Sequence, residues 1–329
     1  FKEVLRKGEG SKWADKAQYQ VGESFFQSKE YSLAAEAFES LLAQYPESDL
    51  REEALYLLAC SDFQQGKYGE AEIKLQNLLK EFPQSPLALY SNYLIGEIAL
   101  KESNYAKALT NYSLALKVEE LSMYALFKIV WCHAQQKQYE EAIGKANDFL
   151  KKYQWGELAG NVLLIEGIAY QKTGRVKEAI GCYQEIVDRY RGSQFFERAL
   201  YLMATAYYEL KGYGQLVTNV YQVLKNTPLS GSRWQEETYF MVAEGYYGLG
   251  KYSEAVKAYE LVVKNFPTSR LLMQAYQGIS SSYAGMGEYD KAFLAQEKAI
   301  ARAQEEGVKV GELTLLEMGN IQFNKKEYE

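Results

Sequence analysis

A thiol stands beside an imidazole at one place in the sequence, Cys132–His133, and His133 is the only histidine of the chain. A cysteine activated by a histidine could act as a nucleophile. Both residues fall in a helical pattern, however, where neighbouring side chains point about 100° apart and cannot readily share a proton. His133 also takes a position that recurs along the chain as tyrosine, so we interpret it as a packed ring and predict no catalytic residue.

The other residues with reactive or ligating side chains form no known site pattern. Cys60, Cys132 and Cys182 lie in separate segments without metal-ligand spacing, and a cysteine inside a helix packs as a small hydrophobic residue. HExxH, paired CxxC and phosphate-binding glycine loops are absent, and the glycines of residues 245–250 fall inside a helical pattern and its end. The sequence therefore predicts a protein without enzymatic activity, metal or cofactor.

Charge and hydropathy narrow the class of partner. The 329 residues carry a net charge of −6, spread along the chain, without the basic stripe that is typical of nucleic-acid binding. An anionic membrane surface is disfavoured for the same reason. No apolar run approaches the roughly 18 residues that a membrane-spanning helix needs. We therefore expect neither a nucleic-acid ligand nor direct insertion into a membrane.

The cysteines and the histidine belong to a sequence unit that recurs along the whole chain. One residue opens the second half of each recurring unit, and we call it the marker. The markers are Tyr31, Tyr68, Tyr105, Tyr139, Val176, Tyr213, Tyr252, Tyr289 and Tyr328. Successive markers stand 34 to 39 residues apart, and self-similarity at this period is typical of stacked structural repeats.

Small and bulky residues around each marker predict a pair of closely packed helices. A mostly small residue stands nine positions before the marker, an alanine three after it and a bulky residue seven after it, as in Gly22, Ala34 and Phe38. Small residues let two helices approach, and the bulky residue fills the adjoining hole. Glycines two positions before the marker are expected to end the first helix in a left-handed conformation. These are Gly66, Gly174, Gly250 and Gly287.

The small–aromatic–alanine–aromatic–proline landmarks at these offsets resemble the tetratricopeptide repeat over essentially the whole chain. Four prolines share one phase of the unit: Pro46, Pro83, Pro228 and Pro267. The 37-residue step and the segments 82–85 (FPQS) and 266–269 (FPTS) are similar to units of bacterial envelope lipoproteins that assist outer-membrane protein assembly, and of the periplasmic Tol-Pal helper protein. The resemblance implies a right-handed, superhelical all-α solenoid of stacked antiparallel helix pairs, whose first helices line a concave, ligand-binding face.

We expect one array over residues 1–329, with about eight full units and a half-unit at each end. The full units are 13–48, 49–85, 86–121, 122–157, 158–194, 195–230, 231–269 and 270–307. Residues 1–12 correspond to the second helix of a preceding unit and 308–329 to the first helix of a ninth. Because repeat arrays need capping elements, the sequence suggests a fragment of a longer array, with natural caps as the alternative.

Three consecutive central units depart from the pattern. Glu120, Gln154 and Arg191 stand where proline is expected, and the step between markers shortens to 34. Val176 replaces the marker tyrosine, and Gln296 replaces the aromatic residue near the end. We expect the superhelix to change curvature around residues 117–160, and this stretch to be the best candidate for a specialised site.

Two rows of aromatic residues on the first helices form the candidate partner-binding face. The first row, twelve positions before the marker, includes Tyr19, Tyr56, Tyr93, Phe127, Tyr201 and Phe240. The second row, five positions before it, includes Phe26, Phe63, Tyr208 and Tyr247, and between the rows lie Glu97, Trp131 and Glu244. Aromatic residues are enriched at binding hot spots, but at helical spacing they also pack between helices, and both interpretations stay open.

These patterns predict a scaffold that binds an extended peptide or a helix of a partner protein, as part of a multiprotein assembly of the bacterial envelope. The periplasm or envelope is the expected compartment, and the cytoplasm is the alternative. Two other functions are open: a self-association module acting through the ends of the array, and a recruitment or regulatory domain of a larger enzyme or signalling protein.

Overall fold

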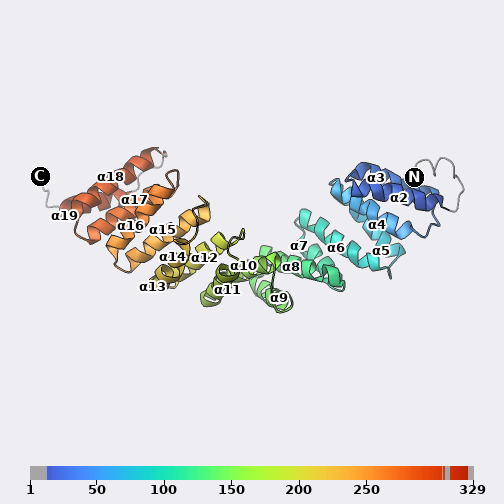
Figure 1. The fold of residues 1–329 in the computed structure, drawn as a ribbon, viewed down its shortest axis with the longest axis horizontal. Helices are drawn as coiled ribbons and strands as arrows, with labels where there is room; N and C mark the ends of the chain where they lie inside the picture. The colour runs from blue at the N-terminus through green and yellow to red at the C-terminus, as the bar shows by residue number, and fades with distance from the viewer. Residues whose placement is uncertain (1–12, 306, 308–311, 325–329) are drawn as a thin grey trace. The chain divides into compact units, whose positions relative to one another are not determined.

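The computed structural model describes residues 13–305, 307 and 312–324, and every regular element in these ranges is a helix (Figure 1). The first helices of the units are α2 (Ala14–Gln27), α4 (Arg51–Gln64), α6 (Pro86–Lys101), α8 (Glu119–Gln135), α10 (Glu157–Lys172), α12 (Phe196–Glu209), α15 (Arg233–Gly248), α17 (Leu272–Gly285) and α19 (Glu312–Asn324). The second helices are α3 (Tyr31–Gln44), α5 (Tyr68–Glu81), α7 (Tyr105–Ala115), α9 (Tyr139–Lys152), α11 (Val176–Arg189), the segment α13 (Tyr213–Gln215), η1 (Leu216–Val220) and α14 (Tyr221–Leu224), then α16 (Tyr252–Asn265) and α18 (Tyr289–Glu305). Each marker within the described ranges is the first residue of a second helix, and the all-α fold class is confirmed.

The chain divides into two compact units, Phe1–Gln154 and Trp155–Glu329. In the first, every helix from α2 to α9 packs on the next one, and α2, α4, α6 and α8 also contact one another in order. In the second, α10 to α19 pack in the same sequential way, with α15 also against α12 and α17. Each unit is therefore a solenoid of stacked helix pairs.

The boundary between the compact units lies inside the stretch 117–160, where the repeat pattern is irregular. The change of curvature expected there stays a prediction, as do the eight repeat ranges of a single array. The half-unit expected at residues 1–12 and the marker Tyr328 lie outside the described residues. Helix α19 falls within 308–329, where a further first helix was expected.

The core of each helix pair contains the predicted hole and its filler. A Cβ atom built on Gly22 would lie 2.7 Å from Cε1 of Phe38, and one built on Gly96 would lie 2.8 Å from Cε1 of Tyr112. Both rings are completely buried. Because real Cβ atoms do not approach so closely, only glycine allows these rings to pack directly on the helix backbone. The sequence prediction is confirmed at these positions.

The turns between first and second helices share one left-handed residue, two positions before the marker. The four predicted glycines take this conformation, with φ between 69° and 79°. In the other four turns it is taken by Lys29, Ser103, Lys137 and Lys211, with φ between 53° and 62°. A side chain in this region costs about 1 kcal/mol relative to glycine, so these four turns are held by the surrounding hydrogen bonds.

Serines just before four of the first helices form hydrogen bonds with the preceding first helix. Ser85 accepts a hydrogen bond from the backbone N–H of Leu87 at 2.8 Å and donates one to Glu52, in the first turn of α4. Three further serine–carboxylate pairs, each 33 or 35 residues apart, repeat this contact: Ser48–Asp15, Ser232–Glu197 and Ser269–Glu236. All four serines thus link their helix to the preceding first helix, and Ser85 and Ser232 also cap the N-termini of α6 and α15.

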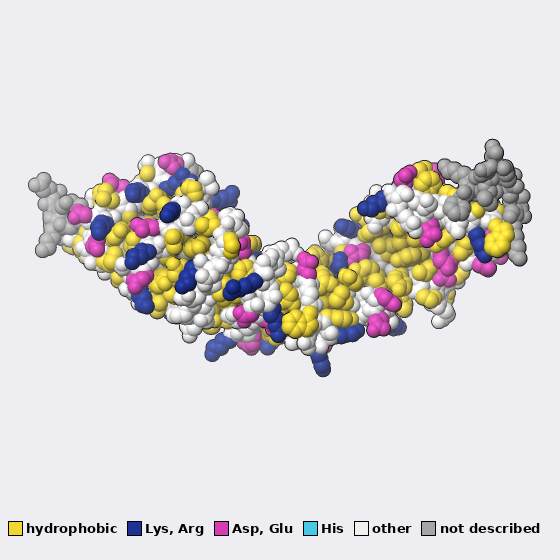
Figure 2. All heavy atoms as spheres, in the orientation of Figure 1, with side chains coloured by type: hydrophobic (Ala, Val, Ile, Leu, Met, Phe, Trp, Pro, Cys, Tyr) yellow, Lys and Arg dark blue, Asp and Glu magenta, His cyan; other side chains and the backbone are white. Residues whose placement is uncertain are grey.

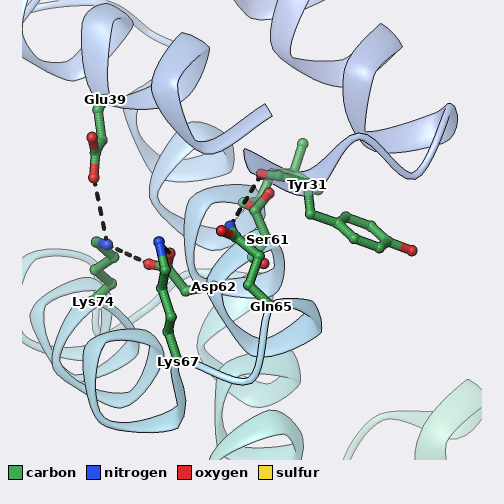
Figure 3. A network of polar contacts seen from close by, with 8 residues as sticks. Tyr31, Glu39, Ser61, Asp62, Gln65, Lys67 and Lys74 are labelled. Carbon is green, nitrogen blue, oxygen red and sulfur yellow. Dashed lines mark hydrogen bonds and ion pairs between the residues drawn. The ribbon is translucent and has the colours of Figure 1, made fainter. Parts of the chain in front are cut away.

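Asp62 is a buried charge that the repeat pattern did not predict (Figure 3). Its carboxylate is 2% exposed and forms an ion pair with Lys74 of α5, while Lys67 lies 4.0 Å away. Lys74 also lies 3.6 Å from Glu39 of α3. Gln65 donates to a backbone carbonyl of α3 at 3.2 Å. These contacts tie α3, α4 and α5 together at one end of the helix pair.

A π-helical turn, η1, interrupts the second helix that begins at Tyr213. Leu216 stands there in the position that alanine holds in other units, and it is completely buried. A Cβ atom built on the facing Gly245 would lie 3.0 Å from Cδ2 of Leu216, so the helices are already in tight contact. The wider π turn gives the larger leucine room that an alanine would not need.

Candidate partner-binding face of the first helices

The structure leaves the predicted partner-binding residues accessible. We call the thirteen residues of the two rows and the positions between them the first-helix face: Tyr19, Phe26, Tyr56, Phe63, Tyr93, Glu97, Phe127, Trp131, Tyr201, Tyr208, Phe240, Glu244 and Tyr247. None of them is fully buried; eleven are half-buried, and Tyr208 and Tyr247 are exposed. The residues of the face belong to α2, α4, α6, α8, α12 and α15.

The aromatic rings of the face are also packed along one side. In the second row, each ring contacts the marker tyrosine of its own unit, with ring centroids 5.4–5.5 Å apart: Phe26–Tyr31, Phe63–Tyr68, Tyr208–Tyr213 and Tyr247–Tyr252. In the first row, three rings contact the aromatic core residue seven positions after the marker: Tyr19–Phe38 at 5.8 Å, Tyr93–Tyr112 at 5.4 Å and Phe240–Tyr259 at 5.7 Å. Tyr201 instead contacts Trp234 of the next first helix at 5.5 Å. Packing and exposure therefore coexist, and the packing holds each exposed ring in a fixed orientation.

In the first compact unit, the carboxylate of Glu97 lies between the rows and is fully engaged. The hydroxyl of Tyr112 donates to Oε1 of Glu97 at 2.6 Å. Nζ of Lys128, on α8, lies 2.8 Å from the same oxygen and 3.0 Å from Oε2. Burial, and then the nearby Glu97, raise the pKa of both Tyr93 and Tyr112, so these hydroxyls stay protonated.

In the second compact unit, Glu244 of α15 takes the same position. The hydroxyl of Tyr259 donates to its Oε1, and that of Tyr208 donates to its Oε2 at 3.5 Å. Burial, followed by Glu244, raises the pKa of Tyr259 and of Tyr208, which therefore remain donors. A cavity of about 660 Å³ opens beside the carboxylate, with Phe240 and Tyr247 on its α15 side.

The same cavity contains residues that the sequence did not single out. Its other walls come from α17, including Met273 and Gly278, and from Glu317 of α19. These residues occupy different offsets from the marker than the two aromatic rows do. Only the contact between successive first helices brings them to Glu244, so a search at fixed offsets within one unit could not find them.

A second cavity, of about 370 Å³, lies between α16, α17 and α18. Its lining includes Lys291, Lys298, Tyr276 and Tyr283. The ammonium groups lie over the rings, at 5.4 Å for Lys291 on Tyr283 and 5.9 Å for Lys298 on Tyr276, and Lys291 also pairs with Glu288 at 2.5 Å. These charges are thus engaged within the chain.

The cysteines and the histidine do not form a reactive site. Cys132 and Cys182 are buried, as expected for packed thiols. Burial raises the pKa of Cys60 and of Cys132 to about 12, so both thiols are protonated at neutral pH and are poor nucleophiles. Nδ1 of His133 shares a hydrogen bond with Gln138 at 2.8 Å. Within the described ranges, no three His, Cys, Asp or Glu residues are grouped closely enough to hold a metal ion.

Charged side chains of both signs are interspersed with hydrophobic ones over the visible surface of each unit (Figure 2). This pattern agrees with the even spread of charge along the sequence and shows no basic stripe in that view. Among the helices that the structure describes, none combines the length and the apolar character that crossing a membrane requires.

Two kinds of family model match the sequence. Residues 12–153 match a family described as outer membrane lipoprotein. Residues 161–193, 237–269 and 274–306 match two models of the tetratricopeptide repeat. The first match nearly coincides with the first compact unit, and the repeat matches all fall in the second. No curated protein matches the sequence significantly.

Solved structures of tetratricopeptide repeat proteins resemble the whole chain. The C-terminal part of such a protein from Cytophaga hutchinsonii is 13% identical, with 91% of this chain and 99% of that chain covered and a TM-score of 0.56. A tetratricopeptide repeat protein from Parabacteroides merdae is 15% identical, with 94% and 98% covered and a TM-score of 0.46. At these identities the likeness concerns the fold. The chain is thus similar to tetratricopeptide repeat proteins in its stacked helix pairs and in the three segments that match repeat models, and residues 12–153 are similar to the outer membrane lipoprotein family.

Proposed function

We propose that the chain is a non-enzymatic scaffold that binds an extended peptide or a helix of a partner protein on the first-helix face. The observation that carries this proposal is the state of the aromatic rows: rings such as Tyr93 and Tyr247 are held along one edge by a tyrosine of their own unit and remain accessible along the other. Rigid aromatic anchors lose little conformational entropy on binding, and such residues are common hot spots at protein interfaces.

The match of residues 12–153 to an outer membrane lipoprotein family supports a place in a bacterial envelope assembly, in the periplasm or at the outer membrane. The acidic net charge of −6 fits a protein partner better than a nucleic acid or an anionic membrane surface. Cell fractionation of the native bacterium tests this location. Recovery of the protein solely from the cytoplasm would contradict it.

The first compact unit offers a test with a matched control. A photoreactive amino acid is placed at Tyr56, Tyr93 or Phe127 in the native bacterium, and the crosslinked segment of the partner is identified by mass spectrometry. A synthetic peptide of that segment is then titrated against the purified chain. The triple alanine variant of the three positions should bind the peptide at least about tenfold more weakly, since single hot-spot residues each contribute more than about 1 kcal/mol.

The control changes the same number of exposed hydrophobic residues on the second helices, namely Leu33, Ile73 and Leu114, which are 39%, 60% and 40% exposed. This variant should bind as the unchanged chain does. Circular dichroism of both variants must show intact helices. An equal loss from the two faces, or crosslinks that form only from the control positions, would refute binding on the first-helix face.

A further inference from the structure

Glu97 and Glu244 occupy the same position in two units, eight residues before the marker, but in the described part of the chain a cation lies beside Glu97 alone. Each carboxylate accepts a hydrogen bond from the tyrosine seven residues after the marker, Tyr112 or Tyr259. At Glu97, the next first helix adds the ammonium group of Lys128 at 2.8 Å. At Glu244, the described residues supply only tyrosine hydroxyls.

The difference comes from one position on the following first helix. Lys128 stands eleven residues before the marker of α9, and the corresponding residue before the marker of α18 is Gly278. Gly278 has no side chain to offer to Glu244, and it lines the cavity of about 660 Å³. The glycine at position 278 therefore accounts both for the lack of a lysine at this position and for the space of the cavity.

The Tyr259 ring shows that this arrangement is built into the packing. A Cβ atom built on Gly278 would lie 2.3 Å from Cζ of Tyr259, so the ring lies against the backbone of α17. In the first unit the ring of Tyr112 lies instead over Gly96, whose counterpart in α15 is Ala243. The ring in the second unit thus occupies the space of a lysine stem, while the space in front of the carboxylate stays open.

We propose that the cavity beside Glu244 receives a cationic side chain, lysine or arginine, of the peptide bound on the first-helix face. This inference rests on the proposed function and adds to it the chemistry of one residue of the ligand. The cation takes the role that Lys128 fills at Glu97.

The chemistry of the cavity fits this ligand. Glu244 is oriented by two hydroxyl donors and keeps acceptor capacity for a charge-assisted hydrogen bond. Phe240 and Tyr247 present aromatic surface to the same space, and a cation gains further from the faces of such rings. Glu317, exposed on α19, adds a second negative charge to the lining. Among the described residues that line the cavity, none is a lysine or arginine that would oppose the cation.

A random-peptide phage library selected on the full chain tests the proposal. Peptides that bind the unchanged chain but not the Tyr247→Ala variant are taken as ligands of the face, synthesised and titrated. We expect these ligands to share lysine or arginine at one position. Replacing that residue with norleucine, or Glu244 with glutamine, should each weaken binding about tenfold or more, as for the loss of a charged hydrogen bond. The Glu254→Gln variant removes an exposed charge from α16 and should bind normally.

The outcomes separate the two claims. Ligands with a fixed cation that lose affinity on both replacements support the cation pocket. Ligands of the face without a preferred cation, or with an affinity that is insensitive to norleucine, overturn the pocket and leave peptide binding standing. If no selected peptide depends on Tyr247, both claims fail for this part of the face. The norleucine measurement keeps the test decisive even where Glu244→Gln disturbs folding.

Discussion

Replacing Glu166 with methionine is expected to stabilise the second compact unit at neutral pH. Glu166 lies in the middle of α10 and is 4% exposed. Other units hold an apolar residue at this position, ten before the marker: Leu58, Ile95, Ile129, Met203, Val242 and Ile279. Methionine at this position is thus compatible with the fold, and it fills a volume similar to that of glutamate.

The expected gain in stability depends on the balance between the hydrogen bonds of the Glu166 carboxylate and the cost of burying its charge. Its hydrogen bonds with Cys182, at 3.5 Å, and with Tyr170 favour the charged form, but burial is the larger effect and raises the pKa of Glu166 above its ordinary value of 4.5. Removing buried charge in favour of a well-packed apolar residue is typically neutral or stabilising, and we expect a gain of about 1–3 kcal/mol at neutral pH.

The sign of the pH dependence is fixed by the raised pKa. Below the ordinary pKa, Glu166 is protonated in both the folded and the unfolded chain, and its carboxyl group carries no ionisation penalty. As the pH rises through the raised pKa, the folded chain must ionise a buried group, and stability is lost. The advantage of Glu166→Met should therefore be smallest near pH 4, roughly the ordinary carboxyl range, and reach its full size above the raised pKa.

Urea unfolding at several pH values measures this difference, and hydrogen exchange in α10 and α11 assigns it to the right unit, because a chain of two compact units need not unfold in one step. The reverse change, Met203→Glu in α12, serves as a control; Met203 is completely buried, so its replacement should destabilise at neutral pH and recover partly in acid. If Glu166→Met lowered the urea midpoint at every pH, the hydrogen bonds of Glu166 would outweigh its desolvation and the reasoning would be wrong.

Three further predictions concern the first unit, and urea unfolding with matched variants checks each of them. Lys137→Gly should stabilise the unit by up to about 1 kcal/mol, because Lys137 has a φ of 60° that glycine adopts without steric cost. Gly66→Ala, at a φ of 79°, should destabilise it by a similar amount. If both variants shifted the urea midpoint in the same direction, backbone strain would be excluded as the cause. Gly96→Ala should destabilise by about 1–3 kcal/mol, since the added Cβ would lie 2.8 Å from a buried ring, and an unchanged midpoint would mean that the ring moves freely. Ser85→Ala should cost about 1 kcal/mol by removing both the N-cap of α6 and the hydrogen bond to α4, a loss that Ser85→Thr should largely avoid.

The features that repeat were predictable from the sequence. Gly22 and Phe38 predict close helix packing because a small residue on one helix leaves room for a bulky residue of the other. The same spacing recurs in unit after unit. Gly66 predicts a residue in the left-handed conformation because glycine adopts that conformation without steric cost. Lys137 shows the limit of this reasoning, since it takes the same conformation without any signal in its side-chain type.

Features that occur once were not predictable. The buried charges of Asp62 and Glu166 depend on donors from neighbouring helices, and their positions in the unit give no sign of those donors. The π turn contains Leu216, which packs against Gly245 of the next unit. In each case the decisive neighbour lies on another helix, 12 residues or more away in sequence, so the repeat period alone does not reveal the contact.

The aromatic rows fall between these cases. Their fixed offsets predicted which side of the first helix they occupy, because residues at i and i+7 lie on one helix face. The offsets could not tell packing from exposure, since Tyr93 does both: one side of its ring contacts Tyr112 and the rest is accessible. How much of the ring is packed depends on how far the second helix extends along it, and this depends on the angle at which the two helices cross.

In a repeat protein, the same polar residue can be compared between units. The comparison shows which of the residues at one repeat position has the surroundings of a binding site. Glu23 stands at the same position as Glu97 and Glu244, but its unit has Phe38 in place of the tyrosine, so no hydroxyl from that position orients the carboxylate. Glu97 has the hydroxyl and also a lysine from the next helix, and its charge is satisfied within the chain. The combination of the acid, the tyrosine and a glycine on the following helix occurs once in the sequence, at Glu244. An oriented carboxylate that opens on a cavity, in a fold that elsewhere supplies the matching ammonium group itself, is the strongest indication in this molecule of what its ligand must bring.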